Sequence, residues 1–552
     1  MKNIFTGITV NFFRKVWSTY QLAIRNLIKL QDHFNLVPSP NLATRSPSRF
    51  RKTDPSHIII TFLSSPQNSL KYNIETFPCC ELIQFIENQT KKQQATPPKN
   101  QSLQTYKQAQ GDWIVYLQSD EIPTPGLVDA LSQVPVDTEI VYWDILYTQN
   151  SQVKPWYKPG WSPELLFSAP LLCGSAIRKE SLLKIASEIF EEGEVSWQEL
   201  LILVLKQKNL KFLHIPKFFS KLQSAIPIQH YLPTAEALVR ASIHPKTTSV
   251  FDAYNAIKHQ WPLENQSVSI IIPTRNNFPV VWRCVTTLLE ITHYHNFNVI
   301  LIDDHSDDPE LFAWYAELSK HPQVRIIKNS EEFNYSKVNN LGAQSSDGQL
   351  LLFLNNDTEI IESDWLEEMV RWAQLPEIGV VGAQLFYPNG TIQHNGIVIG
   401  LGGHAGHIFQ GLPSNSNTIF GSTNWIRNIS AVTGACMMMR RSVFDEVHGF
   451  DEGLKIVFND VDICLKVIKK GYRNLVIPCA RLIHYEGLSR DKALPPQDVE
   501  IGTSKLLPLV KLGDPYFSPR LSHAVNYPTP HRWFEPDPVR RLKRIDFFLS
   551  RK

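Results

Sequence analysis

Short apolar runs alternate with helix-like patterns along the second half of the chain. Each run is bounded by polar residues, which is typical of strands buried on both faces of a sheet. This regular alternation predicts an α/β domain with a mostly parallel sheet that is flanked by helices. The expected strands are 268–273, 297–302, 324–328, 350–355 and 378–386, and the expected helices are 279–291, 309–319, 336–345 and 363–374.

One of these runs leads directly into polar residues. Five apolar residues at 350–354 are followed by Asn355, Asn356 and Asp357. The carboxyl end of a central strand is where open α/β sheets meet their ligands. The same plan recurs at 111–120, where an apolar strand ends in an aspartate, and this recurrence indicates an internal duplication.

The pattern also predicts how the chain is divided. In the first half it favours strands at 58–62, 140–147 and 212–216 and a helix at 194–206. The expected segments are an N-terminal helical segment (1–50), a first α/β unit (51–235), a connector (236–265), a second α/β unit (266–500) and a basic, proline-rich tail (501–552).

Composition excludes several classes of protein. The 55 basic and 53 acidic side chains leave a net charge of +2, which gives no case for a nucleic-acid partner. Seven scattered cysteines without a C-x-x-C pair favour a reducing compartment, so we expect a cytoplasmic protein. No apolar run reaches the ~18 residues of a spanning helix. Residues 1–34 suit either a basic amphipathic helix at the inner face of the plasma membrane or a helix docked on its own domain.

Four polar motifs of the second unit are candidates for chemistry. Three follow predicted parallel strands, whose carboxyl ends meet at one edge of the sheet, and the fourth opens a predicted helix before His484. Each motif also has a structural interpretation as a turn or a helix cap, for example Asn459 as the cap of that helix, and His484 alone could be structural. The motifs are 273–276, 303–307, 355–357 and 459–462.

Taken in order, these motifs resemble family 2 glycosyltransferases of the GT-A fold, such as the rhamnosyltransferases of polysaccharide and O-antigen synthesis. The resemblance covers about 267–490. It implies inverting transfer from a nucleotide-diphospho-sugar to a glycan or lipid-linked acceptor, with Mg²⁺ or Mn²⁺ as cofactor. The segments that carry it are 268–276, 302–307, 354–358, 433–436, 449–452, 459–465 and 484–486.

The resemblance also assigns roles to single residues. Asp460 falls on the catalytic base, although Asn459 replaces the usual glutamate before it. Asp357 and His484 fall on the metal ligands, and Asn355 replaces the first acid of the D-x-D motif. The residues placed at the nucleotide-sugar are Pro273, Thr274, Asn276, Asp303, Asp304, Asn355, Asn356 and Asp357.

The first unit resembles the same fold more faintly, at 111–120 and 158–166. It has Gln118 where the first acid of a D-x-D motif would stand, and residues 196–199 replace the base motif. We therefore interpret it as a degenerate tandem copy that binds the acceptor or acts as a scaffold. The alternative is a second active transferase.

Other hypotheses concern the glycine-rich stretch at 400–405, which formally fits a dinucleotide fingerprint. No long helix can follow it, because Gly406, Gly411 and Pro413 interrupt the segment. His394, His404 and His407 could suggest zinc, but a loop that closes over the sugar, or a plain structural loop, is favoured.

A catalytically silent, sugar- or partner-binding member of the fold is the main functional alternative. Retention of Asp357, Asp460 and His484 together favours an enzyme. The nucleotide base and the sugar stay open.

Overall fold

The structure is a computed structural model. It describes residues 60–64, 80–84, 109–117, 121–124, 126–189, 210–225, 248–252, 255–486, 495–535 and 537–540. The helices expected at 1–50 and 194–206 lie outside these residues, as does the end of the tail.

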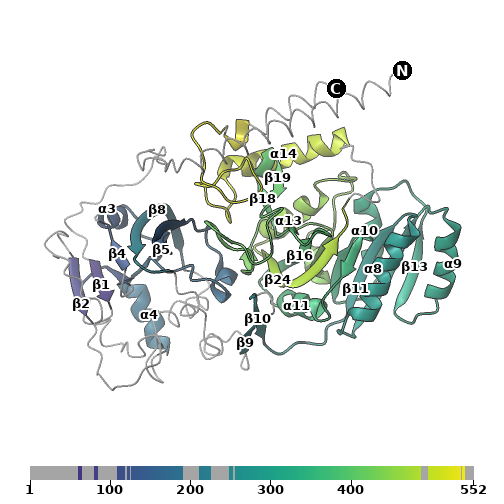
Figure 1. Ribbon diagram of the computed structural model, residues 1–552, viewed down its shortest axis with the longest axis horizontal. Helices are drawn as coiled ribbons and strands as arrows, with labels where there is room; N and C mark the ends of the chain where they lie inside the picture. The colour runs from purple at the N-terminus through teal and green to yellow at the C-terminus, as the bar shows by residue number, and fades with distance from the viewer. Residues whose placement is uncertain are drawn as a thin grey trace.

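The second unit is built on a ten-stranded sheet with the order β13-β12-β11-β14-β23-β16-β24-β15, to which β17 and β22 add at β16 and β24 (Figure 1). The five strands expected from the sequence are all present. The strands are β11 (Val268–Thr274), β12 (Phe297–Asp304), β13 (Val324–Asn329), β14 (Leu350–Leu354), β15 (Thr358–Ile360), β16 (Ile378–Phe386), β17 (Ile392–His394), β22 (Arg427–Asn428), β23 (Cys436–Arg440) and β24 (Arg473–His484).

The direction of the strands divides this sheet into two halves. β13, β12, β11 and β14 are parallel, as predicted. Beyond them the sheet is mixed, because β23 runs antiparallel to both of its neighbours and β15 runs antiparallel to β24. Residues 355–357 alone separate β14 from β15, and so short a link cannot form a parallel crossover.

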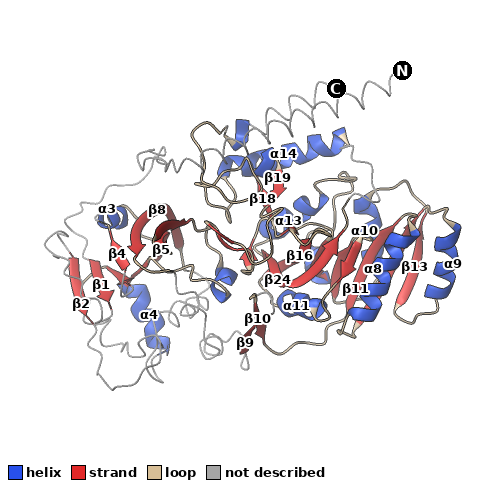
Figure 2. Ribbon diagram, viewed as in Figure 1, coloured by secondary structure: helices blue, strands red, loops and turns tan. Residues whose placement is uncertain are grey.

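Helices cover both faces of the sheet (Figure 2). On β14, Leu350, Leu352 and Leu354 belong to one core, which also holds buried side chains of α8, α9 and α11. Leu351 and Phe353 belong to the opposite core, with α10, α12 and α13. The α/β prediction is therefore confirmed. The helices are α8 (Phe278–Ile291), α9 (Pro309–Leu318), α10 (Tyr335–Gln344), α11 (Trp365–Ala373), α12 (Arg441–Glu446), α13 (Asn459–Lys469) and α14 (Pro496–Leu512).

The helix starts follow local side-chain chemistry in two cases and depart from it in a third. Asp308 accepts from the backbone of the first turn of α9, and Asn334 does the same for α10. At α13 the cap position belongs to Phe458, with φ 65°, and Asn459 is already helical. The interpretation of Asn459 as the cap was therefore wrong. Helix α14 runs through the boundary expected at residue 500.

The first unit contains an eight-stranded sheet with the order β2-β1-β3-β7-β5-β8-β4, and β6 pairs with β5. The strands expected near 58–62, 140–147 and 212–216 correspond to β1, β5 and β8, although residues 58 and 59 are not described. The strands are β1 (Ile60–Ser64), β2 (Cys80–Gln84), β3 (Trp113–Leu117), β4 (Glu121–Pro123), β5 (Ile140–Gln149), β6 (Gln152–Trp156), β7 (Ser175–Arg178) and β8 (Phe212–Leu222); the helices are α3 (Gly126–Ser132) and α4 (Lys179–Ile189).

The two units share one hydrophobic core. Buried side chains of the first unit and of one face of the second belong to the same cluster, and the rings of Trp156 and Trp425 meet edge to face at 5.5 Å. The carboxylate of Glu164 pairs with the guanidinium of Arg473 at 2.6 Å and accepts from Asn428 Nδ2 at 2.6 Å. The hairpin of β9 (Thr248–Phe251) and β10 (Ile257–Gln260) joins the units as well, through His259.

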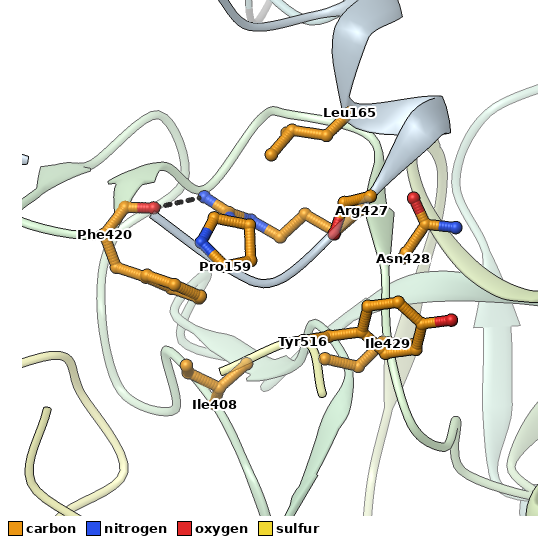
Figure 3. Close-up of a pocket in the computed structure, with 9 residues that line it drawn as sticks. Pro159, Leu165, Ile408, Phe420, Arg427, Asn428, Ile429 and Tyr516 are labelled. Carbon is orange, nitrogen blue, oxygen red and sulfur yellow. Dashed lines mark hydrogen bonds between the residues drawn. The ribbon is translucent and has the colours of Figure 1, made fainter. Parts of the chain in front are cut away.

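A small pocket between the units is filled by protein side chains (Figure 3). Arg427 donates to the backbone oxygens of Phe420 and Ser422 at 3.0 and 2.9 Å, and its guanidinium lies over the rings of Phe409 and Phe420. Burial lowers the pKa of Arg427 to about 9. These contacts identify a packing role for Arg427.

Among the described helices, none is long and apolar enough to cross a membrane.

Candidate active site

The polar motifs meet at the carboxyl edge of the parallel half of the sheet. Thr274 ends β11 and lies in register with Asp303, near the end of β12. Asn356 Nδ2, just after β14, donates to Thr274 Oγ1 at 3.1 Å. Three predicted motifs therefore lie side by side at one edge of the sheet, as the parallel-strand argument requires.

The two aspartates after β12 have different surroundings. The Tyr315 hydroxyl donates to Asp303 Oδ1 at 3.2 Å. Burial, followed by the charge of Asp303, raises the pKa of Tyr315, so this hydroxyl stays a donor. Asp304 Oδ1 accepts from Asn329 Nδ2 at 2.7 Å, whereas its Oδ2 is buried and has no hydrogen-bond partner among the described residues. An unpaired buried acceptor is costly, so a donor from a bound ligand is expected at Asp304 Oδ2.

Asn276 has its side chain engaged within the protein. Its Oδ1 accepts from the backbone of Asp307 and Asp308 at 2.8 and 3.2 Å, and its Nδ2 donates to Asp307 Oδ1 at 2.8 Å. These bonds join the loop after β11 to the loop after β12. The side chain of Asn276 thus shapes the crevice, and its contact with a nucleotide stays a prediction, as does that of Pro273.

Asp357 and His484 lie next to each other because β15 and β24 are paired. Thr358 is in register with His484, and Tyr485 N donates to the backbone oxygen of Asp357 at 2.9 Å. These contacts bring Asp357 Oδ1 within 3.0 Å of His484 Nε2, and both side chains are buried. Asn355 lies beside the pair, with its Nδ2 3.5 Å from His484 Nε2.

This pair fits a small divalent cation. Neighbouring ligands of an octahedral ion at about 2.1 Å are about 3.0 Å apart, which agrees with the 3.0 Å between Asp357 Oδ1 and His484 Nε2. No group of three or more His, Cys, Asp or Glu side chains is placed to hold a metal among the described residues. Mg²⁺ and Mn²⁺ commonly use few protein ligands and complete their shell with substrate phosphates and water.

Asp460 lies in the first turn of helix α13 and contacts Gly434. Its Oδ2 accepts from Gly434 N at 3.1 Å and its Oδ1 from Val461 N at 2.8 Å. The Tyr335 hydroxyl donates to Gly434 O at 3.0 Å and lies 3.4 Å from Asn355 Oδ1. A Cβ on Gly434 would approach the Tyr335 hydroxyl to 2.8 Å. Glycine at this position therefore leaves room for the Tyr335 hydroxyl between Gly434 and Asn355.

The glycine-rich stretch forms a hairpin beside the site. β18 (Ile397–Ile399) pairs with β19 (Ala405–His407), so no dinucleotide-binding helix follows the glycines. His394 Nδ1 and His407 Nδ1 are 3.2 Å apart, and burial, the main cause, lowers the pKa of both. His404 contacts Thr503 Oγ1 at 3.2 Å instead. The structure thus separates His404 from the other two histidines.

Sequence reasoning missed four side chains of the site: Tyr315, Tyr335, Asn329 and Gln393. Gln393 Oε1 lies 2.9 Å from His484 Nδ1. It belongs to the three-residue strand β17, which is too short to show a period in the sequence. The two tyrosines lie on helices whose apolar faces were recognised without a role for their hydroxyls.

An open α/β sheet with these acids, amides and one histidine at one edge is the architecture of a GT-A glycosyltransferase domain. Residues 269–448 match the model of Glycosyl transferase family 2, and the second unit is a domain of that family.

Similar proteins include bacterial proteins of polysaccharide synthesis. The chain is 33% identical over 438 residues to O-antigen biosynthesis protein RfbC of Myxococcus xanthus, which is 75% of this chain and 34% of RfbC. It is 26% identical to the N-acetylglucosaminyl-diphospho-decaprenol L-rhamnosyltransferase of Mycobacterium tuberculosis (strain ATCC 25618 / H37Rv), over 36% of this chain and 69% of that protein. The chain spans 34% of the length of RfbC and 45% of the length of a second relative, which is also 33% identical to it.

Among solved structures, GalNAc-T7 with UDP, GalNAc and Mn²⁺ aligns with a TM-score of 0.37 at 17% identity, over 46% of this chain and 51% of that one.

Proposed function

We propose that this protein transfers a sugar, with inversion, from a nucleotide-diphospho-sugar to a hydroxyl of a glycan or lipid-linked acceptor in cell-surface polysaccharide synthesis. The observation that carries the proposal is the pair of Asp357 and His484. The unpaired oxygen of Asp304 and the carboxylate of Asp460, which accepts from Gly434 N, support it. The similarity to an O-antigen biosynthesis protein and to a rhamnosyltransferase supports the acceptor class.

Each feature has its own task in this proposal. Asp303 and Asp304 accept hydrogen bonds from the nucleoside, beside Thr274. Asp357 and His484 would hold a divalent cation, which would supply positive charge to a departing diphosphate. Asp460 takes the proton of the acceptor hydroxyl while its oxygen bonds to the anomeric carbon and the bond from that carbon to the diphosphate breaks. A single displacement of this kind inverts the anomeric configuration.

A panel of nucleotide-sugars tests the proposal directly. The purified chain is incubated with each donor and Mn²⁺ or Mg²⁺, and the released nucleoside diphosphate is measured with mass spectrometry of the sugar product. We expect turnover with one donor class and its loss on chelation. Turnover that is unchanged by chelation would contradict the metal role of Asp357 and His484.

A silent binding protein of the same fold is the second candidate, and the amides Asn355 and Asn459 at positions that are usually acidic favour it. Binding of a nucleotide-sugar without hydrolysis or transfer across a panel of acceptors would identify it. Cytoplasmic location and contact with a membrane stay predictions, and residues 1–34 lie outside the described part of the chain.

A further inference from the structure

Gln393 connects the predicted metal histidine to a carboxylate on its far side. Gln393 is 2% exposed. Its Oε1 lies 2.9 Å from His484 Nδ1, and its Nε2 donates to Glu486 Oε2 at 3.2 Å. Glu486, Gln393 and His484 therefore form a row. Asp357 lies at its end, on the opposite side of the imidazole.

The chemistry of each atom in this row fixes the direction of its hydrogen bonds. A glutamine donates only through Nε2, and a carboxylate oxygen accepts, so Glu486 holds the amide nitrogen of Gln393 on its own side. The amide oxygen then faces His484 Nδ1, which must carry the proton. In a neutral imidazole the other nitrogen, Nε2, keeps its lone pair. That lone pair lies 3.0 Å from Asp357 Oδ1.

We propose that Gln393, oriented by Glu486, positions His484 as a metal ligand. This inference rests on the proposed function, because it takes the cation between Asp357 and His484 as given. A divalent cation held by both atoms would take the place of a hydrogen bond between them, which the 3.0 Å distance also allows. With the amide turned over, His484 Nε2 would carry the proton and donate it to Asp357, and the imidazole could not bind a metal. Gln393 is thus a positioning residue, since it acts through His484.

The test measures Mn²⁺ binding without any turnover, by electron paramagnetic resonance titration of the full chain. We expect Gln393→Leu to weaken Mn²⁺ binding by about 10–100-fold, the usual effect of losing a partner of a ligating histidine. Gln384→Leu is the matched control, because Gln384 is also fully buried but donates to Thr423 O at 3.1 Å, away from the metal pair. It should bind Mn²⁺ like the wild type even if its melting temperature falls.

A double variant separates indirect from direct action. If Glu486 acts only through Gln393, Gln393→Leu/Glu486→Leu should bind Mn²⁺ no more weakly than Gln393→Leu. Additive losses would overturn the proposed row, as would equal Mn²⁺ binding by the wild type and Gln393→Leu. Absence of Mn²⁺ binding by the wild type would instead overturn the metal site of the proposed function.

A separate observation concerns the first unit, whose eight strands repeat eight of the ten strands of the second sheet, all but β13 and β22. In chain order, β1 to β8 correspond to β11, β12, β14, β15, β16, β17, β23 and β24, and the order across the sheet is the same. Each pairing has the same direction in both sheets: parallel for β1–β2, β1–β3 and β5–β8, and antiparallel for β3–β7, β5–β7, β4–β8 and β5–β6. A register shift interrupts both β5–β8 and β16–β24.

We infer that the first unit is a second copy of the fold that holds no catalytic metal. The carrying observation is one position of the register. Glu121 of β4 pairs with Leu222 of β8, just as Thr358 of β15 pairs with His484 of β24. Leu222 therefore takes the place of the metal histidine, and a buried leucine offers no ligand.

Two variants of the full chain test this inference. Asp120 and Asp357 each precede the corresponding strand directly in the sequence. We expect Asp120→Asn to keep the turnover and the single Mn²⁺ site of the wild type, and Asp357→Asn to lose both. A ten-fold loss of turnover in Asp120→Asn at an unchanged melting temperature would overturn the inference, as would a second Mn²⁺ site that depends on Asp120.

Discussion

Replacement of Asp460 by asparagine tests the chemistry of the crevice with little change in shape. The side chain keeps its size, but it can no longer accept a proton from the acceptor hydroxyl. Asp460 now accepts two backbone hydrogen bonds, from Gly434 and Val461. An asparagine can keep only one of them, because its amide nitrogen must face one of the two N–H groups.

The two consequences differ in size. Loss of a general base lowers kcat by about 10²–10⁴-fold, which corresponds to about 3–5 kcal/mol in the activation free energy. Loss of one backbone hydrogen bond at a partly exposed side chain costs about 1 kcal/mol of the unfolding free energy. The variant should therefore fold, bind donor with a nearly unchanged KM, and turn over slowly.

The assay is steady-state transfer with the donor found in the panel, together with thermal unfolding. Asp462→Asn is the matched control, since Asp462 lies two residues further along α13 and pairs with Lys505 at 2.6 Å. It should lose stability but keep kcat within a few-fold of the wild type. A kcat of Asp460→Asn within ten-fold of the wild type would refute the assignment of the base, and so would an equal loss in Asp462→Asn.

Three further predictions concern the metal, the contact between the units and pH. His484→Ala removes one of two protein ligands, so Mn²⁺ affinity should fall by more than about 100-fold, exceeding the loss of an outer partner; unchanged affinity in a Mn²⁺ titration would exclude His484 as a ligand. Glu164→Ala leaves Arg473 largely buried without the carboxylate that lies 2.6 Å from it, so chemical denaturation should show a loss of about 3 kcal/mol in unfolding free energy. Glu317→Ala, which breaks an exposed pair, should cost under about 0.5 kcal/mol. Equal losses would argue against the buried pair. Burial raises the pKa of Glu368 from 4.5 to about 7. The stability that the protonated side chain contributes is therefore present below about pH 4.5 and lost as the pH rises through 7. The unfolding free energy of Glu368→Gln should exceed that of the wild type by up to about 3 kcal/mol between pH 5 and 8, and a pH-independent difference would contradict this.

The long-range features of the second unit followed from its sequence because they depend on period and order. The five predicted strands all formed, four of them largely buried and β13 partly exposed at the edge of the sheet. The polar ends of three of them lie side by side at one edge. The contact of Asn356 with Thr274 at 3.1 Å is a direct result of parallel order. Asp357 and His484, far apart in sequence, are joined by the pairing of β15 with β24, which the motif order implied and no local pattern could show.

Features set by single side chains in short elements could not be predicted. β17 and β22 have three and two residues, too few for a period of two to appear. Phe458 at the cap of α13 has a left-handed backbone that sequence preference gives no reason to expect in a bulky residue. The hydrogen bonds of Asn276 with the loop after β12 depend on the conformation of that loop, which no sequence period gives.

The continuous core between the two units also limits how this protein can be engineered. Tandem proteins are often treated as strings of modules that can be cut and exchanged. Here the contact of Trp156 with Trp425, and the shared cluster behind it, would become exposed apolar surface on each half after a cut. A chimaera should therefore keep both units together and exchange only loops beside the proposed site, because the second unit depends on its neighbour for part of its interior.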